Sequence, residues 1–275
     1  MTSLFIDLDL SRRLERAEAQ GNIDFVEARA RVDPSVHARW METEGACAMF
    51  DGVESPLTQT FCLGLFEKPT EEGVIRIERF FDERKAPVFH EVSPLADPAA
   101  VEILNRRGYE PFEFTSVMFQ PVEAAMKTLS TELSAVEVRA VSSDEIGLWA
   151  ETSARGWASD MPELGAFMRS FGEIMARKAS GYSLLATLDG DPIATGGLTI
   201  HEGVALFAGA STVPEGRRKG AQAALLDARV RLAAEKGCSL LMMCALPGST
   251  SQRNAERRGF RIAYTRIKWR RRARA

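Results

Sequence analysis

Three cations stand immediately before a glycine in the segment PEGRRKG, at 214–220. Arg217, Arg218 and Lys219 would gather positive charge and backbone N–H groups at one spot. Gly220 has no side chain, so a ligand could approach the backbone closely there. A helix that began directly after Gly220 would add the positive end of its dipole. A turn of this kind predicts a phosphate-binding site.

The residues around the turn predict the elements that would position it. We expect an apolar strand over 204–213 and an amphipathic helix over 220–236, followed by Gly237 as a left-handed cap. The N-terminus of this helix would then point at the basic turn. The alternative is a solvated basic turn without a ligand, and the flanking strand and helix make it less favoured.

Two similar stretches lie about 150 residues apart. LNRRGYEPFEFT at 104–115 and AERRGFRIAYT at 255–265 share Arg-Arg-Gly-aromatic and end in aromatic-Thr. The order strand, helix, strand, helix, strand is expected in both halves. These elements are expected near 57–66, 70–84, 87–93, 97–107 and 113–119, and again near 204–213, 220–236, 239–245, 249–258 and 261–269. The pattern favours two copies of one module over a chance match.

We expect domains at 1–125 and 136–275, joined near 123–135, where no strand pattern is present. In the second domain, Ser142 and Glu145 form a capping-box signature ahead of a helix, and Asp189-Gly190 is a hairpin signal. The first domain is shorter at its front, with a helix over 11–29 and no leading strand. The expected fold class is α/β (α+β) with two modules, each a mixed, largely antiparallel twisted sheet flanked by helices.

Over about 136–269 the sequence resembles the GNAT superfamily of N-acetyltransferases. The spacing Arg217-x-x-Gly220 with small residues behind it, and the order of elements, carry the resemblance. The tandem layout with a degenerate first copy also resembles tandem members. The resemblance implies a diphosphate loop over 217–222, pantetheine contacts near 210–213, and a helix that lies along the CoA. The implied cofactor-binding residues are Ser211, Thr212, Val213, Arg217, Arg218, Lys219, Gly220, Ala221, Gln222, Ser251 and Asn254.

Two positions depart from the family pattern. Gln222 stands where the family prefers Gly or Ala, although its backbone N–H could still face a phosphate. Ala255 stands where the family often has a tyrosine that protonates the CoA thiolate. Tyr264, Ser251 or water would have to deliver that proton. Because a thiol titrates near 8.5, its thiolate is a fair leaving group even without an acid.

The matching turn of the first module, EKPTEEG at 67–73, is acidic. Thr70 is a suitable N-cap, and Glu71 and Glu72 would stabilise the start of a helix. The same acids would repel a diphosphate, and Arg-x-x-Gly is absent. We therefore expect the first module to fold without binding CoA.

The sequence offers no convincing general base. Glu151 is expected to pair with Arg155 one turn on, and Asp160 and Glu163 could either hold a cationic amine or cap a helix. His201 with Glu202 is expected in a solvated turn. His90 is expected to be packed in a first-module strand. Trp149, Trp157, Phe167 and Phe171 are expected in the core, with an acceptor pocket as the alternative.

Composition restricts the partners. Because the net charge is −3, the molecule as a whole is not expected to bind polyanions. No window of 18 consecutive residues is apolar, so no membrane span is expected. Four cysteines without metal or disulfide spacing, and an N-terminus without a secretory signal, favour a cytoplasmic protein with buried thiols and no metal. The basic residues of the last ten are expected in a solvated strand end rather than on nucleic acid; they are Arg266, Lys268, Arg270, Arg271, Arg272 and Arg274.

The resemblance thus predicts an acetyl-CoA-dependent N-acetyltransferase that acts by direct transfer on an amine of a small molecule or peptide. A non-catalytic acyl-CoA-binding or regulatory protein is the alternative, favoured by Ala255 and by the missing base. A homodimer stays open.

Overall fold

The computed structural model describes residues 5–130, 134–159 and 165–272. Two compact units share the chain. Unit 1 consists of Met1–Phe119 and Cys244–Ala275, and unit 2 of Gln120–Met243. The predicted division into modules at 1–125 and 136–275 rests on the sequence repeat and remains a prediction. The two units are defined differently, by which residues contact one another in space. By that definition the last helix and the last strand of the chain belong to unit 1.

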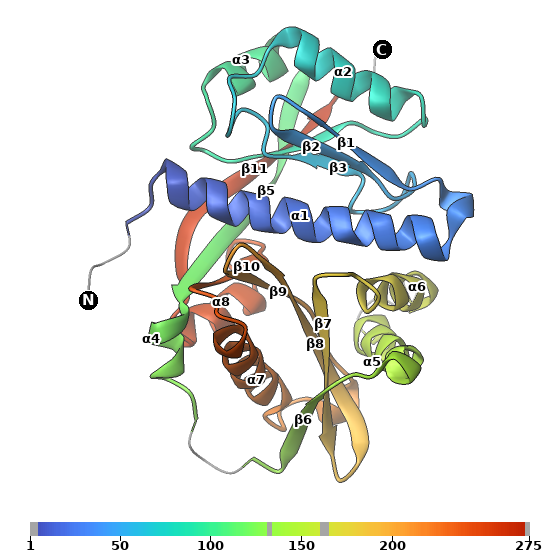
Figure 1. Ribbon diagram of the computed structural model, residues 1–275, viewed down its shortest axis with the longest axis vertical. Coiled ribbons are helices and arrows are strands. Elements are labelled where there is room, and N and C mark those ends of the chain that lie inside the picture. Colours follow the sequence, from blue (N-terminus) through green and yellow to red (C-terminus); the bar gives the residue numbers. More distant parts are fainter. Residues whose placement is uncertain (1–4, 131–133, 160–164, 273–275) are drawn as a thin grey trace. The chain divides into compact units, whose positions relative to one another are not determined.

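Unit 1 is a six-stranded mixed sheet with helices on both faces (Figure 1). Its elements are α1 (Leu8–Val32), β1 (Arg39–Thr43), β2 (Ala46–Phe50), β3 (Gln59–Phe61), α2 (Glu71–Asp82), β4 (Phe89–Val92), α3 (Ala99–Arg106), β5 (Tyr109–Pro121), α8 (Thr250–Arg257) and β11 (Arg261–Arg271). The strand order is β1-β2-β3-β4-β11-β5. β3 and β4 are parallel, and β11 runs antiparallel to both β4 and β5.

Both faces of the unit 1 sheet are buried, so β2 is apolar throughout rather than alternating. Ala48 and Phe50 pack with residues of α2 and α3, whereas Cys47 and Met49 pack with residues of α1. The expected strand over 57–66 is shorter than predicted. It ends at Phe61 because Cys62 takes a left-handed conformation with φ +66°.

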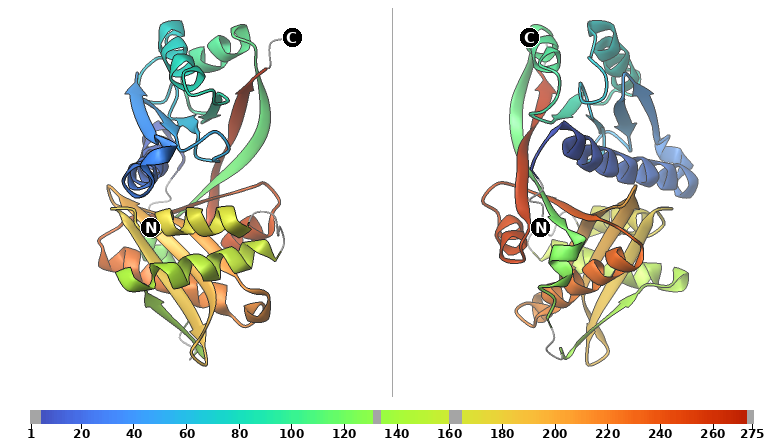
Figure 2. Two further views of the ribbon diagram at one scale, coloured as in Figure 1. Left: turned by 90° about the vertical axis from the view of Figure 1, so that its right-hand side faces the viewer. Right: turned by 60° about the vertical axis from the view of Figure 1, so that its left-hand side comes forward.

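Unit 2 contains α4 (Val122–Met126), β6 (Val136–Ala140), α5 (Ile146–Ala158), α6 (Gly165–Met175), β7 (Gly181–Leu188), β8 (Asp191–His201), β9 (Val204–Thr212), α7 (Ala221–Glu235) and the first part of β10 (Leu240–Ala245). Its strand order is β10-β9-β8-β7-β6, with only β9 and β10 parallel. α5 and α6 lie on one side of this sheet and α7 on the other (Figure 2). The predicted α/β class, a mixed sheet flanked by helices, is confirmed.

Several local predictions are also confirmed. Ser142 and Glu145 make the reciprocal capping-box bonds. Asp189 and Gly190, with φ +53° and +87°, form the left-handed two-residue turn between β7 and β8. Gly237 is left-handed after α7, and Thr70 caps α2 by accepting from the N–H of Gly73 at 3.0 Å.

Candidate functional site

The loop between β9 and α7 is held at its base by β8. The N–H of Val213 donates to the carbonyl of Ile193 at 3.0 Å. Pro214–Gly216 form a 3-10 turn, and Gly216 is buried so close to β8 that an added Cβ would lie 2.7 Å from the Cβ of Ile193. The loop therefore has a fixed starting point, and the three cations that follow it are exposed.

The N-terminus of α7 is open. Gly220 is the N-cap, with φ +82° and ψ −1°, and the first turn contains no acidic residue. In the described part of the chain, no side chain caps this helix, and the first backbone bond is from Ala224 N–H to the carbonyl of Gly220 at 3.0 Å. An added Cβ on Gly220 would meet nothing within 4 Å. Left-handed backbone at Arg218 and Gly220 creates the kind of concavity that binds anions.

The large side chain at position 222 turns away from the helix N-terminus. Gln222 Nε2 donates to the carbonyl of Ser211 at 3.0 Å and to Thr212 Oγ1 at 2.8 Å. The side chain therefore ties α7 to the end of β9. This departure from the family pattern therefore leaves the predicted anion position open.

The end of β9 is bulged and lacks a neighbour on one side. Thr195 pairs with Ser211 and Gly197 with Ala208, so Gly209 and Ala210 together oppose one residue of β8. Gly209 has φ +65°, and its carbonyl accepts from Thr195 Oγ1 at 3.2 Å. β10 pairs with β9 only as far as Leu206. Beyond it, no strand among the described residues covers this edge of β9, which can pair with an extended amide-containing ligand.

The C-terminal end of α5 supports the loop from the side. Arg155 forms an ion pair with Glu215, and Arg217 donates to Ser159 Oγ at 2.5 Å. Gly156 lies so close to β9 that an added Cβ would be 1.9 Å from Ser211 Oγ. Arg217 is therefore hydrogen-bonded to Ser159, the residue that follows α5. No ion pair joins Arg218 or Lys219 to the residues that the structure describes.

Replacing Gly156 with alanine is expected to lower the free energy of unfolding by about 1–3 kcal/mol, because overpacking would push α5 away from β9. Gly147→Ala on the same helix is the matched control, since nothing lies within 4 Å of its added Cβ. That control should be neutral or stabilising by up to about 1 kcal/mol. Urea unfolding measures both, and equal effects of the two changes would contradict the close packing at Gly156.

Three predicted residues lie in unit 1. Ser251 and Asn254 are exposed on α8, and Asn254 Oδ1 accepts from Arg257 at 3.0 Å. Tyr264 lies on β11 and is buried, and its hydroxyl donates to Glu15 Oε1 at 2.9 Å. Burial raises the pKa of Tyr264, and the nearby Glu15 carboxylate raises it further. These contacts favour a structural role for Tyr264, and its catalytic role stays a prediction.

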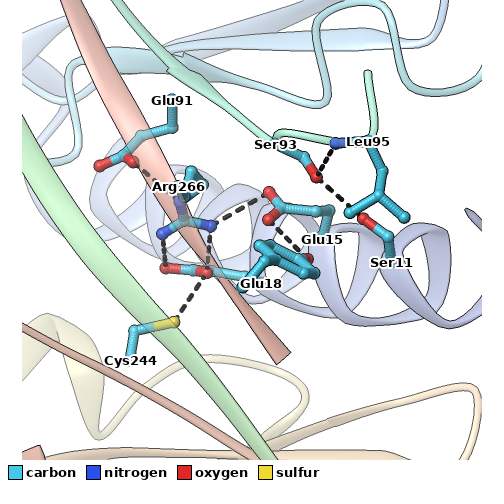
Figure 3. A network of polar contacts seen from close by, with 9 residues as sticks. Ser11, Glu15, Glu18, Glu91, Ser93, Leu95, Cys244 and Arg266 are labelled. Carbon is cyan, nitrogen blue, oxygen red and sulfur yellow. Dashed lines mark hydrogen bonds and ion pairs between the residues drawn. The ribbon is translucent and has the colours of Figure 1, made fainter. Parts of the chain in front are cut away.

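Carboxylates surround the buried Arg266 (Figure 3). Tyr264 joins this network through its hydrogen bond to Glu15. The Arg266 guanidinium donates to Glu15 at 3.0 Å, to Glu18 at 2.7 Å and to Glu91 at 2.8 Å. Only 1% of Arg266 is exposed, so the prediction of a solvated strand end is wrong at this residue. The physical reason is that β11 is an interior strand whose Arg266 meets carboxylates from α1 and β4.

The network predicts a pH dependence of stability. Burial raises the pKa of Glu15 from 4.5 to about 7, and Glu18 adds to the rise against the effects of Arg266 and Tyr264. A carboxyl whose folded-state pKa is raised stabilises the fold below 4.5, and this contribution is lost as the pH rises through about 7. The contribution of Glu15 to the unfolding free energy should therefore fall over this window, and Glu15→Gln should remove that contribution from the pH profile.

Urea titrations of both proteins between pH 4.5 and 8 measure this difference. His90 acts in the opposite direction, because burial lowers its pKa to about 3, but its contribution is common to both proteins and cancels. Burial also raises the pKa of Glu91, and Glu15 is not among the groups that shift it, so its contribution should likewise be common to both proteins. The cysteines beside the network, Cys62 and Cys244, also have raised pKa values and stay neutral here. Identical slopes for the two proteins would rule out titration of Glu15.

The remaining acid–base candidates have structural surroundings. Glu151 pairs with Arg169 at 3.0 Å, so the predicted pairing with Arg155 is wrong; the neighbouring helix α6 brings a closer partner. Asp160 and Glu163 lie outside the described residues. His201 ends β8 and Glu202 begins the turn to β9, and His201 Nε2 lies 3.9 Å from Glu202 Oε2. His90 is fully buried, and neither ring nitrogen has a hydrogen-bond partner among the described residues.

The burial of the aromatic residues and the cysteines tests further predictions. Trp149 is 1% exposed and donates to the carbonyl of Leu184 at 3.0 Å, so its core prediction is confirmed. Trp157 and Phe167 are 37% and 36% exposed, so the core prediction is wrong for these two. Phe171 is partly buried, and its ring lies 5.8 Å from that of Phe167. All four cysteines are free thiols, three of them buried. Within the described residues, no group of His, Cys, Asp or Glu could hold a metal, and no helix is long and apolar enough to cross a membrane.

Two features of the site were missed in the sequence. Gly209 lies inside an apolar strand, and a glycine there is a known sign of a bulge. Gly156 lies inside a helix, where glycine is less stable than alanine, so its presence indicates that another segment packs closely against it. Both glycines were readable signals, but neither indicates which strand or helix approaches it.

Comparison with known proteins places these features in context. Residues 148–260 match the model of the acetyltransferase (GNAT) family. Among solved structures, a GCN5-related N-acetyltransferase from Kribbella flavida is 20% identical with a TM-score of 0.62, covering 92% of this chain and 96% of its own. A tandem GNAT protein from the clavulanic acid biosynthesis pathway is 12% identical with a TM-score of 0.58, covering 82% and 77%.

A putative acetyltransferase of the GNAT family from Novosphingobium aromaticivorans is 15% identical with a TM-score of 0.55, covering 90% and 97%. At these identities the likeness concerns the fold. No curated protein matches the chain.

Proposed function

We propose that this protein transfers an acetyl group directly from acetyl-CoA to an amine of a small molecule or peptide. The match of residues 148–260 to the model of the acetyltransferase (GNAT) family supports the proposal. The observation that carries the proposal is the uncapped N-terminus of α7 beside the uncovered edge of β9. The four free thiols suit a reducing compartment, so the cytoplasm is the proposed location.

The loop would hold the diphosphate of CoA. Backbone N–H groups of Gly220, Ala221 and Gln222 would face the phosphates, with Arg217, Arg218 and Lys219 as the nearby cations. The fit is supported by the open space in front of Gly220 and by the turned-away side chain of Gln222.

The pantetheine arm would lie along β9. Its amides would pair with backbone groups near Ser211, Thr212 and Val213, on the edge of β9 that β10 leaves uncovered beyond Leu206. The Ser211 carbonyl and the Val213 N–H are already bonded to Gln222 and Ile193, so they would not take part. The bulge at Gly209 re-aims the strand there. Ser251 and Asn254 of α8 stay proposed contacts to CoA. A backbone N–H of β9 would polarise the thioester carbonyl and stabilise the oxyanion that develops on it.

The transfer needs an unprotonated amine. Its nitrogen would attack the thioester carbon, the C–S bond would break, and the thiolate would leave with the electron pair of that bond. An alkyl ammonium titrates near 10.4, so the pocket or water must take its proton before or during attack. Ser251 or water could return a proton to the thiolate, which at a pKa near 8.5 leaves without obligatory help. Holding both substrates in line would supply much of the acceleration.

A non-catalytic acyl-CoA-binding protein is the second candidate. It is favoured by Ala255, which is buried on α8 where the family often has a tyrosine, and by the absence of an evident base among the described residues. Both candidates require CoA binding, so turnover decides between them.

The test combines binding with turnover. Acetyl-CoA is titrated calorimetrically into the full chain, and release of the CoA thiol is then followed with a panel of polyamines, aminoglycosides and peptides with free N-termini. Amine-dependent thiol release above the hydrolytic background supports the enzyme. Binding without turnover on any amine supports the second candidate, and no binding overturns both.

A further inference from the structure

Two hairpins occupy the same place in the repeat, each ahead of a strand, a loop and a helix. β1 and β2 are joined by Glu44-Gly45, and β7 and β8 by Asp189-Gly190. In both turns the two residues are left-handed, with φ +52° and +71° in the first. Asp-Gly is a preferred pair in such a turn, whereas glutamate is uncommon in the left-handed conformation. Glu44 therefore calls for an explanation that Asp189 does not need.

In unit 1 the acid lies on the N-terminus of a helix. The Glu44 carboxylate accepts from Thr70 N–H at 2.8 Å and from Thr70 Oγ1 at 2.7 Å, and Thr70 is the N-cap of α2. Arg76 donates to the same carboxylate at 2.9 Å. A backbone N–H, a hydroxyl and a guanidinium thus converge on one anion, as they would on a phosphate.

The surroundings are shaped around this carboxylate. An added Cβ on Gly73 would lie 2.2 Å from Glu44 Oε2, so a side chain there would displace it. Arg76 also donates to Thr43 Oγ1 at 2.8 and 3.0 Å, which fixes the cation to the turn. Burial opposes ionisation of Glu44, but the bonds from Thr70 and Arg76 outweigh it and hold its pKa below the usual value. The group is an anion at neutral pH.

The matching position in unit 2 has no such occupant. Asp189 is exposed, and no hydrogen bond or ion pair joins it to any described residue. α7 begins at Gly220 with no side-chain cap. The two helices follow corresponding strands of the repeat, so one helix N-terminus has an internal anion and the other is open.

We propose that Glu44 is a built-in anion that fills, in unit 1, the position corresponding to the diphosphate position of unit 2. The N-terminus of α2 in the first repeat is thus a site for a phosphate or carboxylate group, and the carboxylate of Glu44 from the same chain occupies it. The protein accordingly binds one acyl-CoA per chain. The comparison with α7 rests on the proposed function, whereas the contacts of Glu44 do not.

The binding stoichiometry tests the first consequence. Calorimetric titration with acetyl-CoA should give one site per chain, lost in Gly220→Asp. Two sites per chain would overturn the inference. No site at all would overturn the proposed function and leave the role of Glu44 to the next experiment.

Replacement of the internal anion tests the role of Glu44 itself. In a Gly220→Asp background, Glu44→Gly removes the carboxylate but suits the left-handed turn. We expect a lower melting temperature, restored by millimolar pyrophosphate but not by sodium chloride of equal ionic strength. Asp189→Gly, the same change at the matching turn, should cause no loss and show no recovery.

Two outcomes would contradict this role: equal melting temperatures for the Glu44 and Asp189 variants, or equal pyrophosphate shifts in both. If Glu44→Gly does not fold, Glu44→Gln keeps the size of the side chain and removes its charge. It should then melt below its parent, and an unchanged melting temperature would overturn the inference.

Discussion

Gly220→Asp should weaken acetyl-CoA binding at least 100-fold, which corresponds to about 2.7 kcal/mol. The new carboxylate would lie at the N-cap of α7, against the proposed diphosphate, and repulsion between charges about 4–5 Å apart near a surface reaches a few kcal/mol. Nothing lies within 4 Å of an added Cβ at this glycine, so the side chain has room. The φ of +82° strains any side chain, but aspartate is among the residues that tolerate it best, so the fold should persist. Calorimetry measures the loss, and circular dichroism checks the fold.

Gly220→Asn is the matched control. Asparagine has nearly the same size, tolerates the φ of +82° better than most residues, and has no charge. It should retain binding within about tenfold of the wild type. If both variants bind as the wild type does, the diphosphate lies elsewhere. Equal large losses in both would show that backbone shape, and not charge, governs the site.

Arg266→Met should be the most destabilising single change in unit 1. It would leave the buried Glu15 and Glu91 and the partly buried Glu18 without their common cation. Removal of one partner from a buried ion pair typically costs about 3–5 kcal/mol. Domain stabilities of roughly 5–15 kcal/mol make this a large fraction of the total. Urea unfolding at pH 8 measures the loss.

The loss should be smaller at pH 5. Protonation neutralises the carboxylates that the guanidinium no longer pairs, and in the wild type burial already raises the pKa of Glu15 to about 7. Arg270→Met on the same strand is the control, because its ion pair with Glu110 is exposed at 2.8 Å and should contribute about 1 kcal/mol or less. A loss at Arg266 no larger than at Arg270 would show that the network does not depend on its central cation.

The predictions that succeeded depend on neighbours in sequence. The Ser142–Glu145 capping box, the Thr70 N-cap, the Asp189-Gly190 turn and the Gly237 cap each involve a few consecutive residues whose side chains and backbone decide the conformation. The turn before α7 was likewise predicted from consecutive residues, those at 214–220. These signals indicate where elements begin and end, so the order of elements along the repeat could be predicted.

The features that were missed depend on which distant segments meet. The alternation in β11 suits any antiparallel neighbour, and nothing local indicates that it lies between β4 and β5. Arg266 in the sequence is one of six basic residues near the end, and its burial follows only from that placement. Likewise, nothing near Glu44 in the sequence indicates its role, because the N–H and hydroxyl that bind its carboxylate come from Thr70, 26 positions later.

The place of β11 also has a consequence for the order of synthesis. β11 follows all of unit 2 along the chain, yet it forms two ladders in the interior of the unit 1 sheet. A nascent chain that has emerged only as far as β5 lacks this strand, and the first-made unit cannot close its sheet before the second has been translated. Pairing across so many residues is intrinsically slow. In the meantime β4 and β5 would present open edges, which are the surfaces that aggregate and recruit chaperones.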